Sequence, residues 1–199
     1  MGNIFSIHSV GRSIITRLRN AYPQDLRDEI ECDFELFSSQ DMHEGNNLQT
    51  TTVALYLYRI TMDQHLRGRE RITPDQSRNT PLALDLHYLF TIWTNSAYHE
   101  HSIMAWLMRE LYQYPVLDRS SLMPEAEWQP DDIVHLIPSE LTTEDIMRVW
   151  EGLGVAYRLS FSYIARVVRI DVTPEPEHPP VVVKRFGYRN WDGLPEADA

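Results

Sequence analysis

The hydrophobic pattern changes period once between residues 81 and 117, and this change predicts a strand followed by a helix. In the first half every second residue is apolar, which is the period of a strand with one buried face. These residues are Leu82, Leu84, Leu86, Tyr88, Phe90 and Ile92. In the second half apolar residues recur at helical spacing: Ile103, Met104, Leu107, Met108, Leu111 and Tyr114. Asn95 or Ser96 can cap this helix, and Pro115 ends it.

Other segments have the composition of strands. Residues 30–37 alternate weakly, residues 53–60 are apolar on both faces, as in a central strand covered on both sides, and residues 133–138 form a short strand. Residues 157–172 alternate again and predict a second long strand. One side of that strand holds Tyr157, Leu159, Phe161, Tyr163, Ala165 and Val167.

Two more helices are predicted, one internal and one at the N-terminus. Thr142 and Asp145 have the spacing of a capping box, and the helix that follows ends at Gly152 and Gly154. Residues 3–20 form an amphipathic helix with one narrow apolar stripe: Ile4, Ile7, Gly11, Ile14 and Leu18. Such a stripe must pack against its own domain or against a neighbouring subunit, so Ile4, Ile7, Ile14 and Leu18 are interface candidates.

The composition changes at Thr173. Residues 173–180 are rich in proline and predict a stiff, extended spacer. A short β-prone segment follows, and we take its apolar residues as interface candidates: Val181, Val182, Val183, Phe186 and Tyr188. Trp191, in the same tail, either anchors a partner or folds back on its own domain.

These elements predict an α+β fold with one mainly antiparallel, long-stranded sheet, packed by two or three helices and followed by an extended C-terminal arm. We expect an N-terminal helix over 1–22, the α+β domain over 23–172 and the arm over 173–199. The polar stretches at 38–50, 61–80 and 118–132 are expected to be loops.

Composition removes several classes of function. The chain has 199 residues and a net charge of −11, which argues against binding to nucleic acid or to anionic lipid. No apolar run reaches the roughly 18 residues of a membrane span, so no direct membrane insertion is expected. The N-terminus lacks the features of a signal peptide, and Cys32 is the single cysteine, so we expect cytoplasmic synthesis and assembly.

Candidate chemistry is sparse. His99, Glu100 and His101 are the strongest metal candidates, but residues two apart point about 200° apart on a helix, and no histidine stands at 103. Asp85 and His87 share one face of a strand. With Ser160 or Ser162 they could form a hydrolase site, although a structural pair is the simpler interpretation. We therefore expect no catalytic residue, no metal and no cofactor.

Three segments together resemble a known family. They are LALDLHYLFTIW, EHSIMAWLMRELYQYPVL and LTTEDIMRVWEGLGVAYRLSFSYIARVVRID, with VALYLYRI upstream. In order and spacing, residues 53–171 are similar to the cap, or tail-terminator, family of phage-tail-like contractile injection systems of the antifeeding-prophage and Photorhabdus virulence cassette type. The N-terminal helix and the stretches at 38–50 and 61–80 match no family motif.

The resemblance implies a structural protein and not an enzyme. Family members form a homohexameric ring on the last layer of inner tube and sheath, at the end distal to the baseplate, so self, sheath protein and inner tube protein are the expected partners. The particle may be released or membrane-anchored. Two alternatives remain: another sheath- or baseplate-associated adaptor of the same machine, and the small hydrolase.

Overall fold

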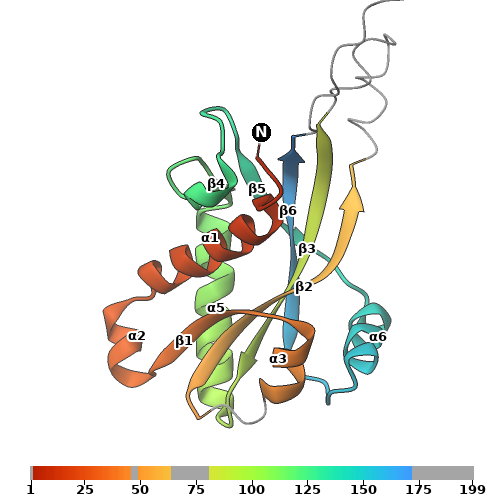
Figure 1. Cartoon of the computed structure of the whole chain (residues 1–199). Coiled ribbons are helices and arrows are strands. Elements are labelled where there is room, and N and C mark those ends of the chain that lie inside the picture. The colour runs from red at the N-terminus through yellow and green to blue at the C-terminus, as the bar shows by residue number, and fades with distance from the viewer. Residues whose placement is uncertain (1, 46–48, 64–80, 172–199) are drawn as a thin grey trace, which may run out of the picture.

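The computed structural model describes residues 2–45, 49–63 and 81–171, which form one six-stranded sheet with helices on both faces (Figure 1). The strand order is β1-β2-β3-β6-β5-β4. The strands are β1 Cys32–Phe37, β2 Thr51–Met62, β3 Leu82–Trp93, β4 Val116–Leu117, β5 Val134–Ser139 and β6 Ser160–Ile170. Only β1 and β2 run parallel to each other. The predicted α+β class with a mainly antiparallel sheet is confirmed, whereas the predicted arm lies outside the described residues.

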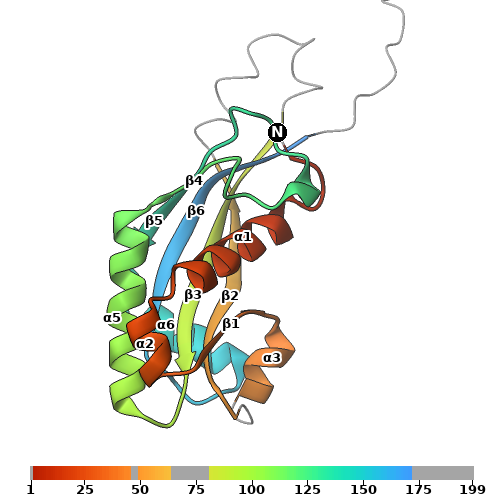
Figure 2. The same ribbon diagram turned by 90° about the vertical axis from the view of Figure 1, so that its left-hand side faces the viewer.

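The helices of the described chain are α1 Ser6–Ala21, α2 Gln24–Glu29, α3 Ser39–Glu44, α5 Ala97–Gln113 and α6 Thr143–Leu153, with a short 3-10 helix, η3, at Pro124–Ala126. Helices α1 and α5 cover one face of the sheet, which we call the α1–α5 face (Figures 1 and 2). Helices α3 and α6 pack on part of the opposite face, the α3–α6 face.

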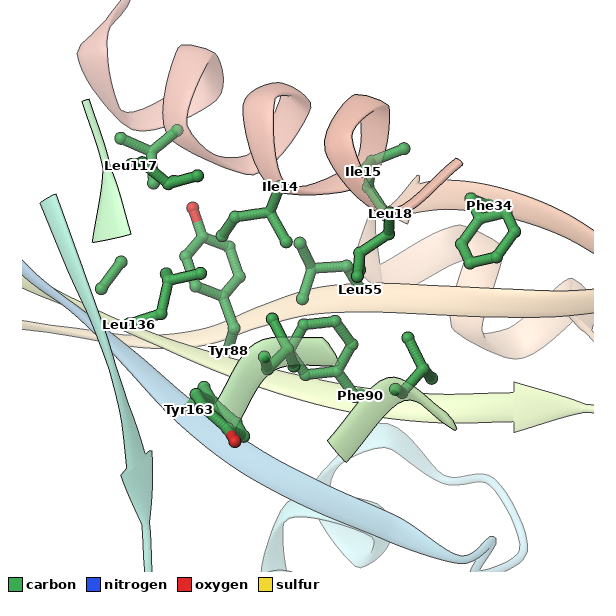
Figure 3. Close-up of a cluster of buried hydrophobic side chains, with 14 of the residues drawn as sticks. Ile14, Ile15, Leu18, Phe34, Leu55, Tyr88, Phe90, Leu117, Leu136 and Tyr163 are labelled. Carbon is green, nitrogen blue, oxygen red and sulfur yellow. The ribbon is translucent and has the colours of Figure 1, made fainter. Parts of the chain in front are cut away.

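Strand β3 is buried on both faces, and this makes it the centre of the fold. The predicted alternating residues from Leu84 to Ile92 belong to the large core of the α1–α5 face. Leu89 and Trp93 point the other way, into a smaller core with Trp150 of α6. Figure 3 shows Ile14 of α1 close to Leu55, Tyr88 and Phe90 in the large core. The N-terminal helix therefore shares its core with the sheet.

Helix α5 begins where the sequence predicts. Ser96 is the N-cap, and its side chain accepts a hydrogen bond from the backbone N–H of His99 at 3.4 Å. Ile103, Leu107 and Leu111 are buried, so the main part of the predicted stripe is confirmed. Met108 and Tyr114 are exposed instead. A helix on a sheet buries a limited arc of its surface, and Met108 falls outside that arc. Tyr114 is the C-cap, where the chain has already left the helical conformation.

The stretch at 38–50 is not simply a loop, because it contains α3. Ser38 and Asp41 form a capping box there, and Met42 is fully buried in the smaller core. The stretch at 118–132 likewise includes η3, with Ala126 and Trp128 buried. In both cases a few apolar side chains find tertiary partners that a short polar sequence does not reveal.

Strand β6 differs from its prediction in its first residue and in which of its alternating residues are buried. It begins at Ser160, and Tyr157 and Leu159 precede it, partly exposed. Leu86 of β3 pairs with Ala165 and Leu84 pairs with Val168, so β6 contains one extra residue, a β-bulge, between these pairs. Val168 consequently takes the buried position that the alternation assigned to Val167.

Strand β2 is covered on both faces only in its first half. Val53, Ala54 and Leu55 are completely buried, as predicted for a central strand. From Tyr56 onward the residues are half-buried or exposed, and Ile60 and Met62 are both exposed. The expected loop at 61–80 begins inside β2, and residues 64–80 lie outside the described chain.

Candidate assembly interface

The structure places the predicted catalytic candidates in separate hydrogen-bond pairs. His87 Nε2 lies 2.9 Å from Thr61 Oγ1, and Asp85 Oδ2 lies 3.3 Å from Nε of Arg166. Ser162 Oγ lies 3.2 Å from the hydroxyl of Tyr58. In the part of the chain that the structure describes, these hydrogen bonds and ion pairs join the three groups to other residues and not to one another.

Ser160 is likewise used structurally, since its hydroxyl donates to the backbone carbonyl of Arg158 and accepts from Nε1 of Trp150 at 3.2 Å. His99, Glu100 and His101 lie in the first turn of α5. Among the residues that the structure describes, no group of three or more histidine, cysteine or acidic side chains is arranged to hold a metal ion.

Asp85 belongs to a small, partly buried charge cluster at three neighbouring strands, with Arg166 at its centre. Arg166 of β6 contacts both Asp85 of β3 and, at 3.7 Å, Asp63 just after β2. Burial raises the pKa of Asp85, Arg166 opposes this rise, and Asp63 adds to it. The Oδ1 atom of Asp85 is buried without a hydrogen-bond partner. These features describe an ion-pair network that joins three neighbouring strands.

Cys32 is unreactive for a physical reason. Burial raises the pKa of its thiol to about 12, with a smaller contribution from neighbouring Asp33. The thiolate, which is the nucleophilic form, is therefore scarce at neutral pH.

The N-terminal interface candidates divide into buried and exposed residues. Ile14 and Leu18 are only 2% and 1% exposed, so these side chains pack against their own domain and leave no surface for a neighbouring subunit. Ile7 is half-buried against the same core. Ile4 is 79% exposed, and the adjacent Phe5, which the sequence analysis did not select, is 55% exposed. We call Ile4 and Phe5 the N-terminal knob.

Backbone hydrogen bonds hold the segment just before the knob in place. Gly2 donates to the carbonyl of Arg169 at 2.9 Å and accepts from the N–H of Asp171 at 2.8 Å, beside the end of β6. Asn3 donates to the carbonyl of Ala126 at 2.9 Å. The knob is therefore presented near the point where the chain enters residues 172–199. The tail candidates Val181, Val182, Val183, Phe186, Tyr188 and Trp191 lie outside the described residues.

A second apolar surface lies between α5, β5 and the start of β6. It is a groove of about 760 Å³, which we call the α5–β5 groove. Its apolar lining comes from Met108, Tyr112, Pro138, Leu141, Ile146 of α6, Phe161 and Tyr163. Tyr112 is 80% exposed and Met108 is 49% exposed, although both are large apolar side chains. The sequence signal for this site was weak, because Met108 fits the helical stripe and Tyr112 lies next to it.

The adjacent sheet edge is protected against strand addition. The N–H of Leu136 points outward from β5 and donates to the carbonyl of Pro115 at 2.7 Å. Pro138, two residues later, faces the same outer edge and has no N–H to donate. At the opposite edge, Arg19 donates to the carbonyl of Phe34 on β1 at 2.5 Å. Because the outer edge of β5 offers few free backbone donors, a partner at the α5–β5 groove would be recognised by its side chains.

None of the helices in the described parts of the chain has the length and apolarity needed to cross a membrane.

Comparison with solved structures finds a similar fold in two proteins. The sheath/tube terminator of PVC, an extracellular contractile injection system, in its extended state, matches with a TM-score of 0.55 and 18% identity. That match covers 91% of this chain and 64% of the terminator chain. The tube-terminating cap of the anti-feeding prophage matches with a TM-score of 0.51 and 18% identity, over 87% of this chain and 61% of the cap chain.

The chain thus spans less than two thirds of the length of either structure. No curated protein is similar enough to count as a match. The model of one protein family, described as the Pvc16 N-terminal domain, matches residues 9–184, which includes every strand of the sheet and almost all of α1. The chain therefore belongs to the Pvc16 N-terminal domain family.

Proposed function

We propose that this protein is a structural cap of a contractile injection system. Six copies form a ring that closes the baseplate-distal end of the inner tube and sheath and stops their growth. The observation that carries this proposal is the fold that the chain shares with a sheath/tube terminator and a tube-terminating cap. The family match over residues 9–184 supports it.

The surface of the molecule is consistent with assembly. Large apolar side chains remain exposed in separate regions of the described chain, at the N-terminal knob, at Met62 of β2 and at Tyr112 of α5. A ring made by head-to-tail contacts needs two different complementary patches on each subunit, and separate apolar regions can supply them.

The tail provides a means of attachment to the sheath. The proline-rich spacer at 173–180 gives reach, and Val181, Val182 and Val183 can pair with an unpaired strand edge in the last sheath layer. The inner tube is the second partner. The protein thereby becomes part of a phage-tail-like particle, and the function requires neither catalysis nor a cofactor.

Electron microscopy of the purified chain mixed with short tube–sheath assemblies tests the proposal. We expect a six-fold ring, corresponding to six copies of the 23.3 kDa chain, at one end of each assembly and none along its side. Leu107→Asp, which removes a core contact, serves as an unfolded control. Bare ends in the presence of folded wild-type protein, or a monomer that hydrolyses esters, would overturn the proposal.

A further inference from the structure

We propose that the N-terminal knob of one subunit inserts into the α5–β5 groove of a second copy, and that this contact joins neighbouring subunits of the ring. The inference rests on the proposed ring and identifies the two surfaces that form it. Both surfaces are apolar and exposed in the isolated chain, although Ile4, Phe5 and Tyr112 are residues that proteins normally bury.

The two surfaces cannot meet within one chain. The knob follows Gly2, which is bonded beside Ile170 at the end of β6. The groove is lined by Phe161 and Tyr163 at the start of the same strand. Strand β6 rises about 3.3 Å per residue, so roughly 25–30 Å separate its two ends. A contact between knob and groove therefore requires a second copy.

The separation also determines the kind of assembly. When two different patches of one chain are complementary, each subunit offers a knob to one neighbour and a groove to the other. The result is a head-to-tail series, which closes into a ring when the rotation between subunits permits. A symmetric dimer, in contrast, would pair one patch with itself.

Shape is the first argument for the match. The groove has a volume of about 760 Å³, which is ample for one isoleucine and one phenylalanine side chain. Because Pro138 removes a donor from the sheet edge, the groove favours insertion of side chains over addition of a strand. The hydrogen bonds of Gly2 and Asn3 fix the chain next to the knob, which lowers the entropic cost of binding.

Charge is the second argument. Residues 2–24 contain Arg12, Arg17 and Arg19 and no acidic residue, in a chain whose net charge is −11. His8 and Arg12 are exposed on the same side of α1, one and two turns after the knob, respectively. The charged lining of the groove is Glu140 and Arg109, and Ile146 of α6 also lines it. The first turn of α6 holds Glu144 and Asp145, and Arg148 pairs with Glu144. Together these are three acidic and two basic side chains, a small acidic excess that complements the basic N-terminal helix.

Cross-linking between single-cysteine chains tests the contact. In a Cys32→Ser background, one full-length chain carries His8→Cys beside the knob, and a second, size-tagged chain carries Ser139→Cys in the groove. His8 is exposed and Ser139 is nearly isosteric with cysteine, so both chains should fold. We expect a short bismaleimide to give a mixed dimer with about tenfold higher yield than the control pair, because docking raises the local thiol concentration.

The matched control replaces Ser139→Cys by Ser39→Cys, on α3, which follows β1 at the other edge of the sheet. A second measurement tests whether the cross-link depends on the knob itself. Phe5→Asp should reduce the His8–Ser139 cross-link to the control level, whereas Ile133→Asp, at another exposed apolar residue, should leave it unchanged.

The outcomes separate this contact from the cap function. A mixed-dimer yield equal to that of the control pair overturns the knob–groove contact, and it does so even when micrographs show capped tube ends. A high yield that is insensitive to Phe5→Asp overturns the role of the knob. A strong, Phe5-dependent cross-link together with bare tube ends supports the contact and overturns the cap function.

Discussion

Two glycines show how strongly the effect of one added methyl group depends on its surroundings. A Cβ on Gly45 would lie 2.7–2.8 Å from three ring atoms of Trp93. That ring cannot move away easily, because it packs against Phe37 and Trp150 in the smaller core. Gly152, in α6, has no atom within 4 Å of the same position.

We therefore expect Gly45→Ala to lower the free energy of unfolding by about 1–3 kcal/mol, because it overpacks the core. Gly152→Ala should raise it by about 0.5–1 kcal/mol, because alanine restricts the unfolded chain and favours the helix. Urea denaturation of both variants measures the two effects. Equal effects of the two substitutions would mean that the contact with Trp93 is not as close as the structure indicates.

Asp85 gives a pH dependence whose sign follows from its environment. Its pKa is raised, mainly by burial, so the folded state holds the proton more tightly than the unfolded state. The free energy of unfolding contributed by this group therefore falls as the pH rises from the ordinary carboxyl value of about 3.9 to the raised value. Above that window the full destabilising contribution is present.

Asp85→Asn should accordingly be more stable than wild type at neutral pH, because the amide mimics the protonated acid. The advantage should disappear as the pH falls below about 3.9, where both states of the wild-type protein are protonated. Thermal melts at several pH values measure the difference. Asp33→Asn, at an exposed residue of β1, is the control. A constant advantage at every pH would contradict the assignment to Asp85.

At the scale of elements, the rotation of α5 about its own axis decides which of its side chains are buried against the sheet. Leu107 is fully buried in the large core, whereas its neighbour Met108 is 49% exposed in the groove. Leu107→Asp places an unpaired charge in the core and should cost more than about 4 kcal/mol, which is enough to unfold a marginal domain. Met108→Asp should cost less than about 1 kcal/mol. Circular-dichroism melts compare the two, and an unchanged melting curve for Leu107→Asp would show that the helix is set differently.

Elements with long, regular hydrophobic patterns were predicted well, whereas features that depend on contacts with distant segments of the chain were not. The alternation from Leu82 to Ile92 and the Ser96 cap act over a few residues, so the sequence contains them in full. Helix α3 has the Ser38–Asp41 capping pair, but its only buried residue is Met42, which leaves no apolar period to detect. The phase change at Val168 depends on the pairing with Leu84, more than eighty positions away, so local alternation could not reveal it.

At the scale of the whole molecule, we propose that the domain over residues 2–171 and the tail have separable roles. Both hydrophobic clusters of the described residues lie between Gly2 and Asp171. Deletion of residues 173–199 should therefore leave the melting temperature almost unchanged. It should weaken attachment to sheath, because the valines that can add a strand are lost. Co-sedimentation with purified sheath measures the attachment.

Deletion of residues 192–199 alone is the control, because it keeps Val181–Val183 and Trp191. Sedimentation of the longer deletion at the wild-type level would show that sheath binding lies on the folded domain. A large drop in melting temperature would instead show that the tail packs against the core.

The sequence by itself determined the class of the fold, the long strand and helix at its centre, and the family. The fold class and the two central elements follow from periodicity, capping and turn chemistry, which act between residues close along the chain, whereas the family follows from the resemblance of whole sequence segments to its members. Only the tertiary structure decided how the interface candidates divide, with Ile14 and Leu18 buried and Ile4 exposed. It also gave Asp85 and His87 different partners, Arg166 and Thr61, and brought α5 and β5 together to form a groove. Those outcomes depend on which distant segments pack together, and local pattern does not contain that information.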